Sequence, residues 1–244
     1  MPTTTAWKVL LSWRKHRNYG ISSYKPVEAA LAGSHLVYFA DPMCSWCWGF
    51  SPVIEAIRRR FTDTVPIRLV MGGLRPQTTK PMDEAAKRST RTHWEHVHEA
   101  SGQPFDFAFF DREGFVYDTD PAARAVIVVR RGSMETALDY LRLVQAAFYA
   151  ENRDVTDETV LADLAEQAGQ NREDFLDAFR SEEAKQETWR DYGIAHQSGI
   201  SGFPTLIAGE GRSNRYSAVT RGYQSALHVV PLIEHWLADT GHRG

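Results

Sequence analysis

The sequence predicts an α/β fold in which a β-α-β unit and a β-β-α unit are separated by a large inserted α-helical domain. Two apolar, β-prone runs at residues 35–40 and 66–71 flank a helical pattern. A long stretch of helical character without a strong strand signal follows them. Strand character returns at residues 202–208 and 216–223, and a helical pattern at residues 224–236 closes the predicted fold.

The first unit opens with residues 35–40, whose nearly continuous apolar character is typical of a buried central strand. A turn follows, and apolar residues then recur at helical spacing over residues 44–61. Pro52 lies inside this helix and is expected to kink it, because proline lacks the N–H donor. The run at residues 66–71 completes a β-α-β unit, which implies parallel strands joined by a right-handed crossover.

Capping signals divide the insertion into several helices. A charged, weakly amphipathic pattern covers residues 82–100, and Pro121 suits the first turn of the next helix. Further helix starts are predicted at Ser133, Thr156-Asp157, Asn171 and Ser181. No Gly/Ser/Pro-rich linker frames the segment, so we expect an insertion and not a separate domain. The predicted boundaries are an N-terminal extension at 1–33, the α/β domain at 34–75 and 196–244, and the helical insertion at 76–195.

The composition is that of an ordinary globular protein: of 244 residues, 43% are hydrophobic and 24% are charged. The formal net charge of −3 provides no basic surface for nucleic acid, so we expect no nucleic-acid partner. No apolar stretch reaches the roughly 18 residues of a membrane span, so we expect no membrane association. Residues 1–27 contain no acidic side chain, which faintly resembles an organelle transit peptide, but they lack the apolar run of a secretory signal. We therefore expect a cytoplasmic protein.

Cys44-Ser45-Trp46-Cys47 lies at the junction of the first predicted strand and the first helix. At a helix N-terminus, unpaired amide groups and the helix dipole favour an anion, so we expect Cys44 to be an exposed, nucleophilic thiolate. Cys47 lies one turn later inside the helix, where it can resolve a mixed disulfide. A Cys-x-x-Cys pair in this position, within this order of units, predicts a thioredoxin-like fold.

A Cys-x-x-Cys pair can also be half of a zinc site, but the chain has no further cysteine. Zinc would need histidines, and His93, His96 and His98 form the local cluster. Their spacing matches no known zinc finger, so we expect solvated histidines and no metal. Two inert cysteines are a further alternative, which their place at a strand–helix junction disfavours. We expect no cofactor beyond the redox-active disulfide, with glutathione as a candidate co-substrate.

Residues 202–205, Gly-Phe-Pro-Thr, form a second feature that supports redox chemistry. Within sheets, proline is confined to the first position of a strand, to an edge strand or to a bulge. We predict a cis Phe203–Pro204 bond beside the cysteines, with the Phe203 backbone turned toward an extended substrate. An ordinary trans proline is the alternative. We expect Trp46, Phe203 and Thr205 to contact the substrate.

Residues 39–52, Phe-Ala-Asp-Pro-Met-Cys-Ser-Trp-Cys-Trp-Gly-Phe-Ser-Pro, resemble the DsbA-like superfamily, and most closely its FrnE-type branch of candidate protein-disulfide isomerases. The resemblance covers about residues 35–238. It implies a thioredoxin fold with a helical insertion, a nucleophilic Cys44, a resolving Cys47 and a cis proline at Pro204. Further segments similar to that branch are residues 71–76, 101–105, 117–121, 147–149 and 199–205.

Two positions depart from the superfamily pattern. DsbA and thioredoxin carry a buried acid six residues before the nucleophile, where this chain has Tyr38. Asp41, three residues before Cys44, is the nearest substitute as a proton acceptor, with a turn or helix-capping role as the alternative. DsbA also has a histidine between its cysteines, where Trp46 brings no charge. Both departures argue against a strongly oxidising enzyme.

The leading hypothesis is a thiol–disulfide oxidoreductase of the isomerase or reductase type, acting on protein or small-molecule disulfides. The first alternative is a glutathione-dependent transferase or isomerase of the kappa or 2-hydroxychromene-2-carboxylate isomerase type. Those branches usually replace the cysteine pair with a serine, so the intact pair argues against them. For such an enzyme, Asp118, Thr119, Asp120 and Arg124 are candidates to bind a small polar ligand. The second alternative is a redox-sensing interaction module without turnover.

Overall fold

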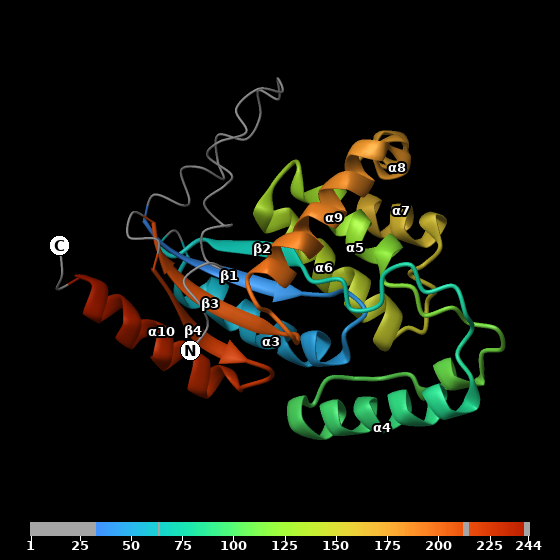
Figure 1. Cartoon of the computed structure of the whole chain (residues 1–244), viewed down its shortest axis with the longest axis horizontal. Coiled ribbons are helices and arrows are strands. Elements are labelled where there is room, and N and C mark those ends of the chain that lie inside the picture. Colours follow the sequence, from blue (N-terminus) through green and yellow to red (C-terminus); the bar gives the residue numbers. More distant parts are fainter. Residues whose placement is uncertain (1–32, 63, 212–214, 242–244) are drawn as a thin grey trace.

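The structure, a computed structural model, describes residues 33–62, 64–211 and 215–241 (Figure 1). The first unit consists of β1 (Ser34–Ala40), α3 (Ser45–Arg60) and β2 (Ile67–Met71). Both predicted units are present, which confirms the α/β architecture. Apart from Gly33, the predicted N-terminal extension lies outside the described residues. The last unit consists of β3 (Thr205–Glu210), β4 (Arg215–Arg221) and α10 (Ala226–Gly241).

The segment between β2 and β3 is helical, as predicted. The predicted caps Ser133, Asn171 and Ser181 each accept a hydrogen bond from the backbone N–H three residues later. The 3-10 helix η2 was not predicted; it begins where the Asp106 side chain accepts the Ala108 N–H. The elements are α4 (Glu84–Ser101), η2 (Phe107–Asp111), α5 (Asp120–Arg130), α6 (Met134–Tyr149), α7 (Glu158–Gln167), α8 (Arg172–Arg180) and α9 (Glu182–Gln197).

The four strands form one mixed sheet in the order β2-β1-β3-β4. β1 pairs in parallel with β2, as the predicted crossover requires, and antiparallel with β3, which pairs antiparallel with β4. Alternate residues of a strand point to opposite faces. Leu36, Tyr38 and Ala40 accordingly join one apolar cluster, whereas Val37 and Phe39 join another. β1 is buried on both faces, which explains its nearly continuous apolar sequence.

Helices cover both faces of the sheet (Figure 1). α3 and α10 pack on the face that presents Tyr38, where both helices contribute to the larger apolar cluster. α9 covers the opposite face, where Ile194 and Ala195 join the smaller cluster. Because α9 is the last helix of the insertion, the inserted segment completes the layer that buries β1.

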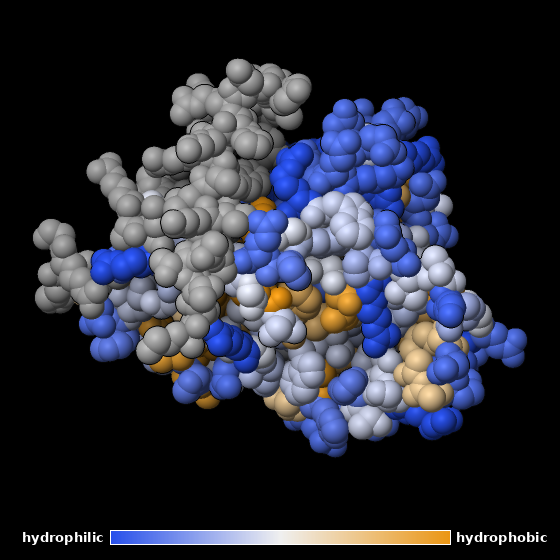
Figure 2. All heavy atoms as spheres, in the orientation of Figure 1, coloured by the Kyte–Doolittle hydropathy of each residue, from blue (hydrophilic) through white to orange (hydrophobic). Residues whose placement is uncertain are grey.

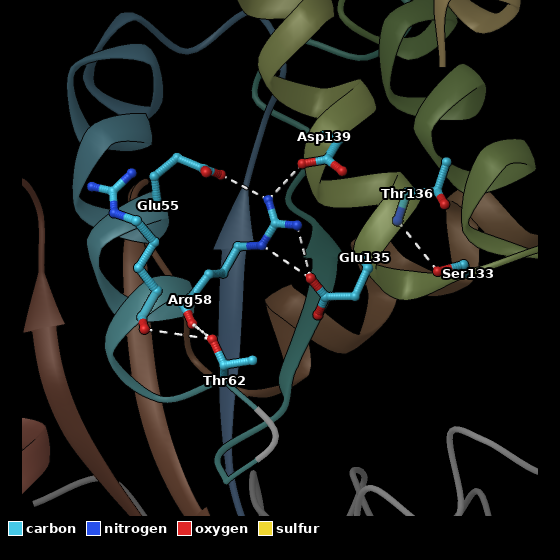
Figure 3. Close-up of polar contacts among 8 residues, drawn as sticks. Glu55, Arg58, Thr62, Ser133, Glu135, Thr136 and Asp139 are labelled. Carbon is cyan, nitrogen blue, oxygen red and sulfur yellow. Dashed lines mark hydrogen bonds and ion pairs between the residues drawn. The ribbon is translucent and has the colours of Figure 1, made fainter. Parts of the chain in front are cut away.

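Arg58 of α3 pairs with three carboxylates, two of which belong to α6 (Figure 3). Its guanidinium lies 2.7 Å from Glu55 on its own helix, and 2.8 Å from Glu135 and 2.6 Å from Asp139 on α6. The two carboxylates of α6 lie on one side of that helix, one turn apart, so both face the same arginine. The pairs hold α6 against the helix that carries the cysteines.

β2 is an edge strand, and side chains cover its free backbone groups. The Met71 N–H donates to Asp191 Oδ2 at 2.8 Å, and Arg130 Nη1 donates to the Leu69 carbonyl at 2.7 Å. Arg130 and Asp191 also pair with each other at 2.6 Å. Since an uncovered edge is a site for unwanted strand pairing, this ion pair of a buried carboxylate and a half-buried guanidinium closes the sheet on the side of the insertion.

Pro52 does not end α3, which continues to Arg60. Proline cannot donate a hydrogen bond to the carbonyl four residues earlier, which here belongs to Trp48. That carbonyl instead accepts Gln103 Nε2 at 3.1 Å, and the same amide donates to Ser51 Oγ at 2.9 Å. The missing N–H of Pro52 therefore creates the acceptor by which the segment after α4 docks on α3.

Candidate active site

Cys44 and Cys47 lie at the carboxyl end of β1, where the chain turns into α3. Cys44 is the N-cap residue of α3, and its carbonyl accepts the N–H groups of Cys47 at 3.0 Å and Trp48 at 3.1 Å. Both thiols are free, and their side chains lie in hydrogen-bonding contact. The first turn of α3 therefore holds the two sulfur atoms side by side.

The prediction that Cys44 is exposed is wrong, because only 6% of its surface is accessible. Cys44 is nevertheless the more exposed of the two cysteines, as expected, since Cys47 is 0% exposed. The Cys44 thiol donates to the Phe203 carbonyl at 3.6 Å, across 159 residues of sequence. Because the residue that buries Cys44 is so distant in the sequence, the residues around the cysteines do not predict this burial.

Burial raises the pKa of the Cys47 thiol well above its ordinary value, and contact with Cys44 adds to this shift. The Tyr38 side chain of β1 lies beside the Cys47 side chain. Burial likewise raises the pKa of Tyr38 well above its ordinary value. The position that carries a buried acid in DsbA and thioredoxin thus holds a neutral hydroxyl beside the second thiol.

Asp41 is fully buried in the turn after β1. Its carboxylate accepts the N–H groups of Met43 at 2.9 Å and Leu74 at 2.8 Å, and a hydrogen bond from the Thr119 side chain. Burial raises the pKa of Asp41 to about 6, although these hydrogen bonds oppose the shift. The charge of Asp41 also influences Cys47. A carboxyl group that titrates near neutral pH therefore lies close to the buried thiol, and the same group stabilises the turn.

The Phe203–Pro204 bond is cis, as predicted, and it directly precedes β3. The Phe203 ring packs so closely on Gly72 that a Cβ atom at Gly72 would lie 2.1 Å from Cζ of the ring. Gly72 immediately follows β2, so the ends of β2 and β3 meet beside Cys44. The sequence identifies Gly72 only as a strand end, and its contact with Phe203 requires the fold.

The remaining residues expected to contact substrate differ in their surroundings. Trp46 is partly exposed, and its ring lies 5.7 Å from that of Tyr223. Thr205 is buried, and its hydroxyl donates to the Gly202 carbonyl at 2.8 Å. Trp46 is thus available to a bound molecule, whereas Thr205 faces its own loop and does not reach the surface.

The polar residues at the start of α5 interact with the cysteine region and with each other. Thr119 is fully buried and its Oγ1 accepts the Arg75 N–H at 3.1 Å, in addition to its contact with Asp41. Asp120 and Arg124 form an ion pair at 3.3 Å. Thr119 therefore supports the loop after β2 and is not open to a ligand.

His93, His96 and His98 are exposed on α4, and His98 Nδ1 lies 2.8 Å from the Gln103 carbonyl. No group of three or more His, Cys, Asp or Glu residues suited to a metal ion occurs among the described residues. Likewise, none of the helices that the structure describes combines the length and apolar character of a bilayer span.

The surface over the end of β1 and the turn that follows it is partly apolar. Figure 2 shows hydrophobic atoms near the centre of this face, bordered by weakly polar and hydrophilic ones. Leu74, in the loop after β2, is 40% exposed. Leu74 borders the turn before Cys44, because its N–H donates to Asp41 Oδ2 at 2.8 Å.

Three residues around the cysteines carry roles that the sequence did not identify. Tyr38 appeared only as a missing acid, Gly72 as a strand end and Tyr223 as part of the last strand. Each takes part in a contact between two elements: Tyr38 with Cys47 of α3, Gly72 with the Phe203 ring, and Tyr223 with the Trp46 ring. The Gly72-Gly73 pair was the available signal, since two adjacent glycines after a strand indicate close approach of another chain segment.

Comparisons with known proteins agree with this geometry. A model of the DSBA-like thioredoxin domain matches residues 35–223. A solved structure of a candidate protein disulfide isomerase from Nitrosomonas europaea is 37% identical, with a TM-score of 0.79. The match covers 85% of this chain and 98% of that one.

Two further relatives are more distant. The ClpXP adapter protein SpxH of Bacillus subtilis is 25% identical over 75% of this chain and 58% of its own length. This chain therefore spans less than two thirds of that relative. The cytosolic disulfide reductase DsbM of Pseudomonas aeruginosa has the same fold, with a TM-score of 0.66, 24% identity and coverage of 86% of this chain and 98% of that one.

Proposed function

Because the chain belongs to the DSBA-like thioredoxin domain family, we propose that it is a thiol–disulfide oxidoreductase of the isomerase or reductase type. The observation that carries the proposal is the arrangement of the two free thiols at the start of α3, with Cys44 against the Phe203 carbonyl. Cys44 attacks a substrate disulfide and Cys47 resolves the resulting mixed disulfide. The substrate is a protein or small-molecule disulfide.

The proposed cycle consists of two thiol–disulfide exchange steps and the reduction of the enzyme. The Cys44 thiolate attacks one sulfur of the substrate, a new S–S bond forms, and the other substrate sulfur leaves with the electron pair. Cys47 then loses its proton and attacks Cys44 Sγ, which releases the second substrate sulfur as a thiol. The enzyme is left oxidised as a Cys44–Cys47 disulfide, and an external thiol such as glutathione reduces it again.

Asp41 is the proposed acceptor of the Cys47 proton. A general base works best when its pKa lies near the operating pH, and burial raises the pKa of Asp41 to about 6. Trp46 and the Phe203 backbone are the proposed substrate contacts, because both border Cys44 or its partner thiol. Pro204 is proposed to hold Phe203 in this position.

A cytoplasmic location is part of the proposal, since a reducing compartment keeps such a dithiol reduced. Fractionation of cells that express the full chain, with soluble and membrane markers, tests this location.

The identity with SpxH supports a second candidate, an adapter that binds a protein partner without turnover. An adapter would not need its thiols for binding. The two candidates therefore differ in what happens when the cysteines are removed.

Reduction of insulin with a thiol donor tests the leading proposal. We expect the wild type to accelerate the reaction and Cys44→Ala to abolish the acceleration. Cys47→Ala should accumulate mixed disulfides that mass spectrometry detects. Ser45→Ala, which keeps both thiols, is the matched control and should remain active. Wild-type protein that neither reduces insulin nor forms mixed disulfides would overturn the proposal, and glutathione conjugation measured in parallel would then support a transferase.

A further inference from the structure

Cys47 must lose a proton in every turnover of the proposed cycle, yet it has no contact with solvent. Asp41 is equally buried, so it cannot pass a proton directly to water. Tyr38 is the other polar group at the thiol. A phenol hydroxyl can accept one proton while it donates another, and burial keeps its pKa too high for it to retain a negative charge.

A small cavity of about 10 Å³ lies between α3 and α6, and Tyr38 of β1 is one of its lining residues. Three aliphatic side chains form part of its wall, and Ser51, Glu55, Arg142 and Gln145 supply polar atoms. Glu55 is half-buried and Arg142 is exposed, so the cavity lies close to the surface where these two residues line it. The volume is close to the smallest that holds one water molecule, and such a water needs two to four polar partners.

Gln145 gives independent evidence for a molecule in the cavity. The residue is 1% exposed, and its Nε2 has no hydrogen-bond partner among the described residues. A buried amide donor without a partner costs about 1–3 kcal/mol. One water molecule would satisfy it, and Ser51 and Tyr38 are among the residues that line the same cavity.

We propose that this cavity holds one ordered water molecule that, together with Tyr38, carries the Cys47 proton to solvent between α3 and α6, with Gln145 as the positioning residue for the water. The proposal rests on the proposed function. This relay is a second outlet for the Cys47 proton beside its transfer to Asp41. As Cys47 attacks Cys44 Sγ, its proton passes to the Tyr38 oxygen while the Tyr38 proton passes to the water. The water releases a proton to Glu55 or to solvent, and the departing substrate sulfur takes the electron pair of the broken S–S bond.

The charged and titratable groups around this route are few. Cys44, Asp41 and Tyr38 act on Cys47 from the turn and from β1. Glu55 and Arg142 lie at the cavity. Glu55 is also held by Arg58, which pairs with α6 (Figure 3). The ion pairs of Arg58 thereby fix the two helices that enclose the water.

The two steps of the reaction can be separated with 5,5′-dithiobis(2-nitrobenzoate) on the full chain. Attack by Cys44 releases the first coloured thiolate, and resolution by Cys47 releases the second. In Gln145→Met and Tyr38→Phe we expect an unchanged rate of the first phase and a second phase that is slower by about tenfold or more. This factor lies toward the low end of the rate contribution of a positioned acid–base group. The difference in second-phase rate between each variant and the wild type should shrink as the pH rises, because hydroxide then takes the Cys47 proton in place of the relay.

Gln145→Glu keeps a polar partner for the water and should restore most of the rate. Leu138→Met, which changes the cavity wall without a polar group, should behave as wild type. A high-resolution crystal structure should contain the water in the wild type and lack it in Gln145→Met. An equal second phase in Gln145→Met, or a dry wild-type cavity, would overturn this inference. Failure of the wild type to release the second thiolate would instead overturn the proposed function.

Discussion

Replacing Asp41 by asparagine should change how the stability of the protein depends on pH. The carboxyl is fully buried and accepts the N–H groups of Met43 and Leu74. Burial raises its pKa from 3.8 to about 6. Asparagine keeps the size of the side chain and one acceptor oxygen but cannot ionise, so it removes the titration while nearly preserving the packing.

The direction of this pH dependence follows from the pH at which the folded and the unfolded chain each release the Asp41 proton. Between the unfolded value of 3.8 and the folded value of about 6, the folded chain retains a proton that the unfolded chain has lost. The stabilisation is therefore fully present below the unfolded value and is lost as the pH rises through about 6. A shift of this size corresponds to about 3 kcal/mol in the free energy of unfolding.

Urea unfolding of the reduced wild type and of Asp41→Asn should be compared between about pH 4 and about pH 8. The free energy of unfolding of the variant relative to wild type should rise by about 2.5 kcal/mol over this range, because at about pH 4 the unfolded carboxyl is already partly ionised. A constant offset from the altered hydrogen bonds does not affect that rise. Asp111→Asn, at an exposed carboxylate of η2, should show no such trend. A flat difference curve for Asp41→Asn would refute the reasoning.

The remaining predictions concern the packing and the redox poise. Gly72→Ala should displace the Phe203 ring, lower the rate of insulin reduction several-fold and lower the free energy of unfolding in urea by about 1–3 kcal/mol. The control is Gly132→Ala, where the new Cβ atom would meet only a carbonyl oxygen at 3.6 Å. Equal effects of the two substitutions would contradict the reasoning. Asp191→Ala removes the carboxylate that pairs with Arg130, so the free energy of unfolding should fall by about 3–5 kcal/mol, and a loss below about 1 kcal/mol would count against a structural role for the pair. In glutathione buffers the reduction potential should lie in the reducing half of the range between about −270 and about −120 mV, because a resolving thiol with a raised pKa does not stabilise the reduced form; a value above about −150 mV would contradict this.

The fold follows from the sequence wherever a pattern is local. The apolar run at residues 35–40 predicts a central strand, and the structure places β1 at Ser34–Ala40 between two neighbours. The capping residue at Ser133 predicts the start of α6. The 3-10 helix η2 escapes prediction because its aromatic residues are held by packing around Trp94, on another helix.

The candidate site is less accessible to sequence reasoning, because its parts come from distant segments. The Cys-x-x-Cys and the proline before β3 are recognisable as motifs. The burial of Cys44 is not, since it depends on the Phe203 carbonyl. The partner of Tyr38 and the unsatisfied amide of Gln145 depend on how α3 lies against the sheet and against α6. Side-chain contacts across elements are set by the packing of the whole domain, which no local pattern encodes.

Asp41 and Tyr38 differ in what they can do with a proton from Cys47. Asp41 can store it, because its pKa is about 6. Tyr38 can only pass it on, because burial holds its pKa well above its ordinary value. In the resolution step, Asp41→Asn should therefore remove an inflection near pH 6, whereas Tyr38→Phe should lower the rate and leave that inflection in place. The double variant decides whether the two groups serve one route: effects that add in free energy indicate two independent routes, and a double variant no slower than the slower single variant indicates one. Loss of the inflection in Tyr38→Phe would contradict this division of roles.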